Sequence, residues 1–126
     1  MTDRSRIERR RRVADGFAAE DHVERHLAKN GFSCLSRRFK VKQGEVDLVV
    51  KRSNLIVFVE VKKRKSLSEG LFSITPRAQK RISAAASLWI AENPEHHDAD
   101  SDFRFDAAIV LPDGKIEIVE NAFSAS

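Results

Sequence analysis

Two carboxylates and an amine interrupt the most strand-like stretch of the sequence, GEVDLVVKRSNLIVFVEVKKRK at residues 44–65. Asp47 lies in the first apolar run of this stretch, and Glu60 and Lys62 lie in the second. Side chains alternate between the two faces of a strand, so Glu60 and Lys62 are predicted to share one face. If the two runs pair around a tight turn at residues 52–54, facing residue numbers sum to about 106–107, which places Asp47 beside Glu60.

A pair of carboxylates in a strand interior suggests a metal site. Two such groups at close range repel each other unless one takes up a proton or a cation neutralises both. Mg²⁺ and Mn²⁺ prefer oxygen ligands, commonly one or two carboxylates together with water or phosphate oxygens. Such a metal would supply a water nucleophile, and Lys62 would orient or deprotonate that water or neutralise a phosphorane. The spacing alone fits equally well an Asp–Glu–Lys ion-pair cluster at a sheet rim.

The elements that must position these residues follow from hydrophobic periodicity. Residues 13–30 have helical spacing and end at Asn30-Gly31, and Glu20 lies near the centre of their apolar stripe. A second helix is predicted from Pro76, capped by Thr75, to Asn93. Residues 63–74 and 94–101 are predicted to be loops. Strands are predicted at residues 32–41, 45–51, 55–62, 103–111 and 115–120, with 55–61 as a central strand covered on both faces.

The charged strands belong to a larger set of short motifs. In order, the chain contains Ala19-Glu20, "GEVDLV" at 44–49, "FVEVK" at 58–62 and "RFD" at 104–106. Together they resemble the motifs of the YraN family of bacterial endonuclease-like proteins. Asp47 followed by Glu60-Val61-Lys62 is similar to the signature of the restriction-endonuclease-like, PD-(D/E)xK nucleases. The likeness spans residues 16–123, and Val46 stands where the superfamily motif has Pro.

This resemblance implies a fold and a site. It implies an α/β fold with a restriction-endonuclease-like αβββαβ core, in which helices flank a mixed sheet. Carried over by position, it implies that Asp47, Glu60 and the Val61 carbonyl hold Mg²⁺ or Mn²⁺ and that Lys62 is the catalytic lysine. Glu20 would be an accessory acid from the first helix, which would explain its place in the apolar stripe.

Charge is distributed unevenly along the 126 residues. The chain has a net charge of +4, which equals the charge of residues 1–12 with six Arg and two acids. We therefore expect a flexible basic tail at 1–12 and one nuclease-like domain at 13–126. Basic residues within this domain are candidates for phosphate contacts, with salt-sensitive binding: Lys63, Arg64, Lys65, Arg77, Lys80 and Arg81. A solvated basic surface explains the charges alone equally well.

Other polar residues are expected to have structural roles. His96 and His97 fall in a polar loop without a third ligand and are expected to be exposed. Asp106 follows Phe105 in a strand and is expected to be a structural hydrogen-bond acceptor. Glu24 is expected to lay its stem across the edge of the core with its carboxylate in water.

These observations lead to a hypothesis with two alternatives. The sequence predicts a Mg²⁺- or Mn²⁺-dependent nuclease-like protein that acts on DNA, with branched or damaged DNA among its candidate substrates. The first alternative is a non-catalytic nucleic-acid-binding or assembly module with the same fold, and the second is a protein-interaction domain. A homodimer is compatible with the sequence. The lone Cys34 excludes an internal disulfide, and no membrane span or secretory signal is expected, so the cytoplasm is the expected location.

Overall fold

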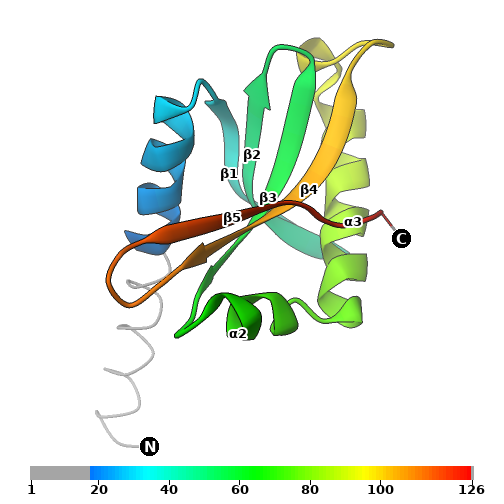
Figure 1. The fold of residues 1–126 in the computed structure, drawn as a ribbon. Helices are drawn as coiled ribbons and strands as arrows, with labels where there is room; N and C mark the ends of the chain where they lie inside the picture. The colour runs from blue at the N-terminus through cyan, green and yellow to red at the C-terminus, as the bar shows by residue number, and fades with distance from the viewer. Residues whose placement is uncertain (1–17, 126) are drawn as a thin grey trace, which may run out of the picture.

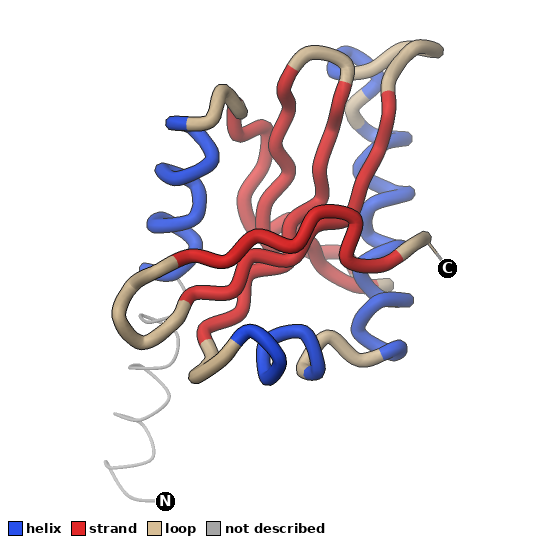
Figure 2. Tube along the Cα trace, viewed as in Figure 1, coloured by secondary structure: helices blue, strands red, loops and turns tan. Residues whose placement is uncertain are grey.

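A five-stranded mixed sheet forms the centre of the protein (Figures 1 and 2). The structure is a computed structural model that describes residues 18–125. The strands are β1 (Ser33–Val41), β2 (Gly44–Arg52), β3 (Leu55–Lys63), β4 (Asp102–Val110) and β5 (Ile116–Phe123), and they lie side by side in this order. β3 and β4 are parallel, whereas the other neighbours are antiparallel. The predicted strands are therefore confirmed to within a few residues, and the mixed α/β class is correct.

Helices cover both faces of this sheet. The first helix is described from residue 18 to residue 29, and it is followed later by α2 (Leu67–Phe72), α3 (Pro76–Glu92) and the 3-10 turn η1 (Pro94–His96). Figure 1 shows the first helix and α3 on opposite sides of the sheet and α2 near the end of β3. The parallel pairing of β3 with β4 requires a crossover, and α2 and α3 supply it. The predicted tail and residues 13–17 of the predicted helix lie outside the described residues.

The core has one layer on each face. Val23 and Leu27 of the first helix pack against Leu48 and Val59 on one face. On the other face, residues of α3 that include Trp89 pack against the large side chains of β2 to β5. β3 contributes to both layers, so the prediction of a central strand covered on both sides is confirmed. Within residues 18–125, no helix is long and apolar enough to cross a membrane.

Local signals in the sequence explain where the long helices begin and end. The Thr75 hydroxyl accepts a hydrogen bond from the Ala78 N–H at 3.1 Å, and Pro76 occupies the first helical turn, as predicted. Gly31 ends the first helix with φ +88°, a conformation that most side chains disfavour. Gly44 lets β2 approach α3 closely, because a Cβ atom there would lie 1.9 Å from the Arg81 carbonyl oxygen.

Two loop predictions were wrong in part. Residues 67–72, predicted as loop, form α2, because the Ser66 hydroxyl caps the Glu69 N–H and the buried Gly70 lets the short helix contact Ile109. The predicted loop at 94–101 contains a 3-10 turn, and its histidines are half-buried rather than exposed. The His96 ring stacks on Trp89, and His97 Nε2 lies 2.8 Å from the Ile90 carbonyl oxygen. The contacts of these two rings with the last turn of α3 could not be inferred from the polarity of the loop.

Candidate active site

The three residues that drew attention in the sequence meet where β2 and β3 separate. The ladder between these strands ends at the pair Leu48–Val59, whose numbers sum to 107, so the predicted register is confirmed. One step further, Asp47 and Glu60 lie close enough for the Asp47 carboxyl group to raise the pKa of Glu60. The Lys62 Nζ atom lies 3.3 Å from Glu60 Oε1. The turn at residues 53–54 thus brings Asp47 beside Glu60, which lies thirteen positions further along the chain.

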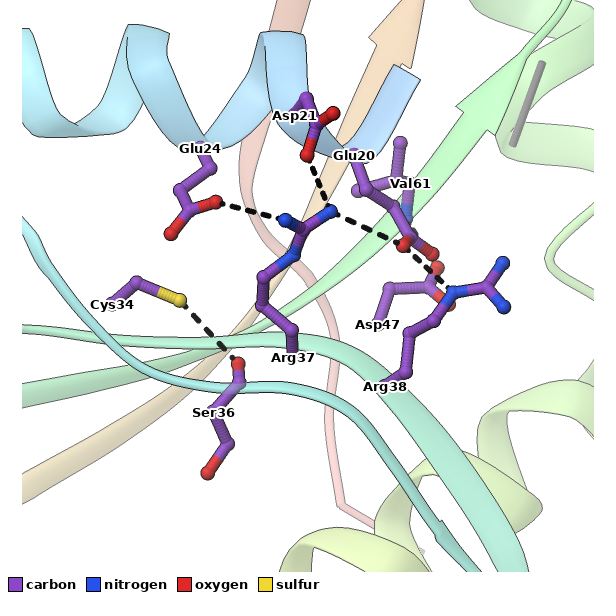
Figure 3. A network of polar contacts seen from close by, with 9 residues as sticks. All are labelled: Glu20, Asp21, Glu24, Cys34, Ser36, Arg37, Arg38, Asp47 and Val61. Atoms are coloured by element: carbon purple, nitrogen blue, oxygen red, sulfur yellow. Dashed lines mark hydrogen bonds and ion pairs between the residues drawn. The ribbon is translucent and has the colours of Figure 1, made fainter. Parts of the chain in front are cut away.

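Asp47 also contacts the backbone of β3. Its Oδ2 atom accepts a hydrogen bond from the Val61 N–H at 2.8 Å. The N–H and C=O of a strand residue point to the same edge of that strand, so the Val61 carbonyl is directed toward the Asp47 side as well. Figure 3 shows Asp47 next to Val61 and below the first helix. Two carboxylates and a carbonyl oxygen therefore converge at this point.

The alternation of side chains along β2 is interrupted at Asp47. Val46 packs in the core layer that contains α3, whereas Leu48 packs in the layer under the first helix. Residues two apart in a regular strand would lie on one face. On the adjacent strand β1, Arg38 has φ +51°, which is uncommon for a residue with a long side chain. These irregularities adjoin each other in the β1–β2 register, because the flanking pairs are Arg37–Leu48 and Phe39–Val46.

Glu20 joins the site from the first helix and is held by arginine. Its Oε2 atom lies 2.8 Å from Arg38 Nε and 3.8 Å from Arg37 Nη2 (Figure 3). Arg37 also pairs with Asp21 at 2.7 Å and with Glu24 at 3.5 Å, so the expectation of a solvated Glu24 carboxylate is only partly right. Burial raises the pKa of Glu20, and the Asp47 charge adds to this, while Arg38 opposes it.

The electrostatics of Glu60 reflect a conflict between like charges. Its side chain is buried, with 9% of the residue surface exposed. Burial, followed by the charge and hydrogen bond of Asp47, raises the pKa of Glu60 to about 8, although Lys62 acts in the opposite direction. In the absence of a cation, the Asp47–Glu60 pair therefore retains a proton near neutral pH.

A cavity of about 430 Å³ connects Glu20, Asp47, Glu60 and Lys62 to solvent. Its lining includes seven of the predicted site residues and three residues that sequence reasoning did not single out as site residues. The lining residues are Ala19, Glu20, Arg38, Glu45, Asp47, Glu60, Val61, Lys62, Lys63 and Arg64. Arg38 could have been found from the β1–β2 hairpin, because a turn at residues 42–43 places it across from Asp47.

The donor set suits a hard divalent cation. Asp47, Glu60 and the Val61 carbonyl supply oxygen atoms only, which is the chemistry that Mg²⁺ and Mn²⁺ prefer. Such a cation would also offset the repulsion between Asp47 and Glu60, which favours a protonated carboxyl group in the metal-free protein. Among residues 18–125, no three His, Cys, Asp or Glu side chains are arranged to hold a metal by themselves. Any cation here would therefore take its remaining ligands from the backbone, water or a bound phosphate.

The predicted phosphate-binding residues are spread over two places. Lys63 and Arg64 line the cavity, whereas Lys65 continues the chain into the loop before α2. Arg77, Lys80 and Arg81 are exposed on the first turns of α3 and do not line the cavity. Because Gly44 touches the Arg81 backbone, these turns lie close to the start of β2.

Asp106 has the structural role that was predicted. It accepts hydrogen bonds from Arg104 Nε at 2.7 Å, from Arg104 Nη2 at 2.8 Å and from the Asn121 N–H at 2.9 Å. The RFD motif thus fastens β4 to β5 rather than contributing to the cavity.

Comparison with known proteins places the chain in a family. The model of the uncharacterised protein family UPF0102 matches residues 19–110, which contain every residue that lines the cavity. The chain belongs to the UPF0102 family. A UPF0102 protein of Rhodopseudomonas palustris is 41% identical over 128 residues, covering 99% of this chain and 97% of the relative. Another from Bradyrhizobium diazoefficiens is 42% identical over 111 residues, covering 88% and 82%. A third from Nitrobacter winogradskyi is 39% identical over 111 residues, covering 88% and 92%.

Proposed function

We propose that this UPF0102 protein binds DNA and hydrolyses phosphodiester bonds with Mg²⁺ or Mn²⁺. The observation that carries the proposal is the Asp47–Glu60 pair, a half-buried and a buried carboxylate that interact electrostatically within an open cavity and next to Lys62. Fold stability does not explain such a pair, because the repulsion between two like charges destabilises the folded state. The likeness to YraN proteins and to the restriction-endonuclease-like topology supports the same reading.

Each residue has a proposed task in the reaction. Asp47, Glu60 and the Val61 carbonyl would hold the cation, which when bound activates water and stabilises negative charge on phosphate oxygens. Lys62 orients the attacking water and offsets charge on the phosphoryl group. Glu20, positioned by Arg38, would accept a hydrogen bond from that water or from a ligand of the cation. Hydrolysis forms a bond from the water oxygen to phosphorus and breaks one ester bond, and the leaving oxygen takes up a proton.

The test compares two ion pairs of the same geometry. In both pairs, Lys62–Glu60 and Lys115–Glu117, the residues are two apart in sequence and the Nζ–Oε1 distance is 3.3 Å, although Lys115 lies just before β5 rather than on a strand. We expect Glu60→Gln and Lys62→Met to slow the cleavage of labelled DNA by about 100-fold or more. Glu117→Gln, on the edge strand β5, and Lys115→Met, just before this strand, should cleave like the wild type. Duplex, single-stranded and branched DNA are assayed with Mn²⁺ and with EDTA.

Metal binding provides a second readout that does not depend on turnover. Titration with Mn²⁺, followed by electron paramagnetic resonance, should show a site that Glu60→Gln weakens and Glu117→Gln leaves intact. Folded wild-type protein that cleaves none of the three DNAs with Mn²⁺ would contradict the proposal.

A non-catalytic binding module is the second candidate, and six exposed cations between residues 63 and 81 favour it. It predicts salt-sensitive DNA binding that survives both EDTA and Glu60→Gln, without cleavage.

A further inference from the structure

The side chain of Phe72, at the end of α2, is 87% exposed. Burial of a Phe side chain normally stabilises a fold, and Phe72 forgoes most of this contribution. Within residues 18–125, it also stacks on no other ring, whereas Phe58, Phe103, Phe105 and Phe123 form an aromatic cluster. A single exposed apolar residue is common on protein surfaces, so the setting of Phe72 must decide what its exposure means.

The helix that presents Phe72 is firmly attached to the sheet. A Cβ atom on Gly70 would lie 2.5 Å from the Ile109 side chain, so α2 packs against β4 more closely than a residue with a side chain would permit at this position. Leu71 packs against the buried core. Both ends of α2 are capped, because the Ser66 hydroxyl accepts from the Glu69 N–H and the Ser73 N–H donates to the Glu69 carbonyl. The exposed ring is therefore held on a rigid support.

The chain on both sides of Phe72 is strongly basic. Between residues 63 and 81 there are six cations and one carboxylate, Glu69, and all seven side chains are exposed. Among the described residues, none of the six forms an ion pair, although Arg37, Arg38 and Arg104 all do. Lys63 and Arg64 also line the cavity that contains Glu60, so the basic surface is continuous with the candidate active site. The cations of this basic surface are Lys63, Arg64, Lys65, Arg77, Lys80 and Arg81.

We propose that Phe72 is a stacking platform for an unpaired base and that the protein engages a single-stranded segment of its nucleic acid. An aromatic ring among unpaired cations is the arrangement by which proteins hold single strands, with bases on the ring and phosphates on the cations. Bases inside a duplex are stacked on both faces and are not available to the ring. The inference rests on the proposed binding of nucleic acid, but not on its cleavage. It narrows the substrate class to single strands, or to strand ends and branches that expose a base.

The test uses a fluorescent replacement of the ring in EDTA, where no cleavage occurs. In Phe72→Trp, the introduced indole retains a stacking face on the surface, while the native Trp89 is fully buried and gives a constant background. Titration with a single-stranded oligonucleotide should quench the introduced indole, and a blunt duplex of the same length should quench it much less.

A second test compares the single-strand affinity of two variants of α2. Phe72→Leu keeps an apolar side chain without a π face and should weaken single-strand binding about tenfold, since stacking on an aromatic ring is worth roughly 1–3 kcal/mol per base. Leu67→Ala, on the same helix and 37% exposed, should leave binding unchanged. Binding is measured by fluorescence anisotropy at fixed salt.

The outcomes separate this inference from the proposed cleavage. Quenching by single strands in a protein that never cuts would support the stacking platform and contradict the nuclease. Cleavage that depends on Glu60, without quenching and with full affinity in Phe72→Leu, would support the nuclease and overturn the platform. Equal quenching by blunt duplex and single strand would also overturn it, as would an effect of Phe72→Leu on urea stability that accounts for the lost binding.

Discussion

Two buried carboxylates lie on neighbouring strands of the same sheet and have opposite surroundings. Asp106 of β4 is 4% exposed, and Glu60 of β3 is 9% exposed. Both oxygens of Asp106 accept hydrogen bonds, Oδ1 from Arg104 and Asn121 and Oδ2 from Arg104. Glu60 instead contacts another acid, Asp47, and has a single lysine 3.3 Å away.

The contrast shows how a structural charge differs from a candidate functional one. A buried carboxylate is tolerated when donors satisfy it, as at Asp106. Glu60 faces a like charge in a cavity, and burial with Asp47 raises its pKa to about 8. Perturbed groups of this kind concentrate at functional sites. The partners of each acid, more than its burial, therefore indicate its role.

The largest expected difference in the free energy of unfolding is between variants that neutralise Asp106 and variants that neutralise Glu60. Asp106→Asn should lower the free energy of unfolding by about 3–4 kcal/mol, because the half-buried Arg104 guanidinium then keeps only the exposed Glu120 carboxylate, 3.7 Å away, as a charge partner. Glu60→Gln should not lower it and should raise it by up to about 3 kcal/mol at pH 7, because folding at this pH forces wild-type Glu60 to take up a proton that Gln does not need. Urea unfolding in EDTA measures both. Similar losses in the two variants would contradict the contrast.

A smaller effect is expected from pH. The pKa of Glu60 rises from 4.5 to about 8 on folding. Its contribution to stability is therefore fully present below pH 4.5 and is lost as the pH rises through about 8. Metal-free wild type should lose roughly 3 kcal/mol of unfolding free energy between about pH 5.5 and 8 from this group.

Urea unfolding in EDTA across this pH range checks the expectation, with Glu60→Gln as the control that lacks this slope. Mn²⁺ should bind more tightly as the pH rises, because its ligands must be deprotonated. Parallel pH profiles for wild type and Glu60→Gln would show that Glu60 does not titrate in this range.

The smallest expected effect on stability concerns the backbone conformation of the residues beside Asp106 and beside Asp47. Asn121 and Arg38 both have positive φ, at +52° and +51°. Asn121 is suited to this conformation and directs its N–H at Asp106. Asn121→Ala should cost about 1 kcal/mol, whereas Asn121→Gly should cost less. Thermal unfolding distinguishes the two, and equal losses would mean that the backbone conformation carries no penalty at this position.

Some features of the site followed directly from the order of residues. On the condition of tight pairing around a turn at residues 52–54, the sequence predicted the β2–β3 register that brings Asp47 beside Glu60, and the structure has this register. The structural role of Asp106 was also predicted correctly. The short helix α2 was missed, because six residues give too little periodicity and its formation depends on contact between Gly70 and Ile109.

The sequence by itself determined the strands, the long helices and the meeting of Asp47, Glu60 and Lys62, since these depend on periodicity and on short turns that act over neighbouring residues. Only the tertiary structure decided the placement of Glu20 against Arg38, the break in alternation at Asp47 and the outward display of Phe72. These features arise where segments distant in sequence pack together. Packing selects among arrangements that local propensity leaves equally favourable.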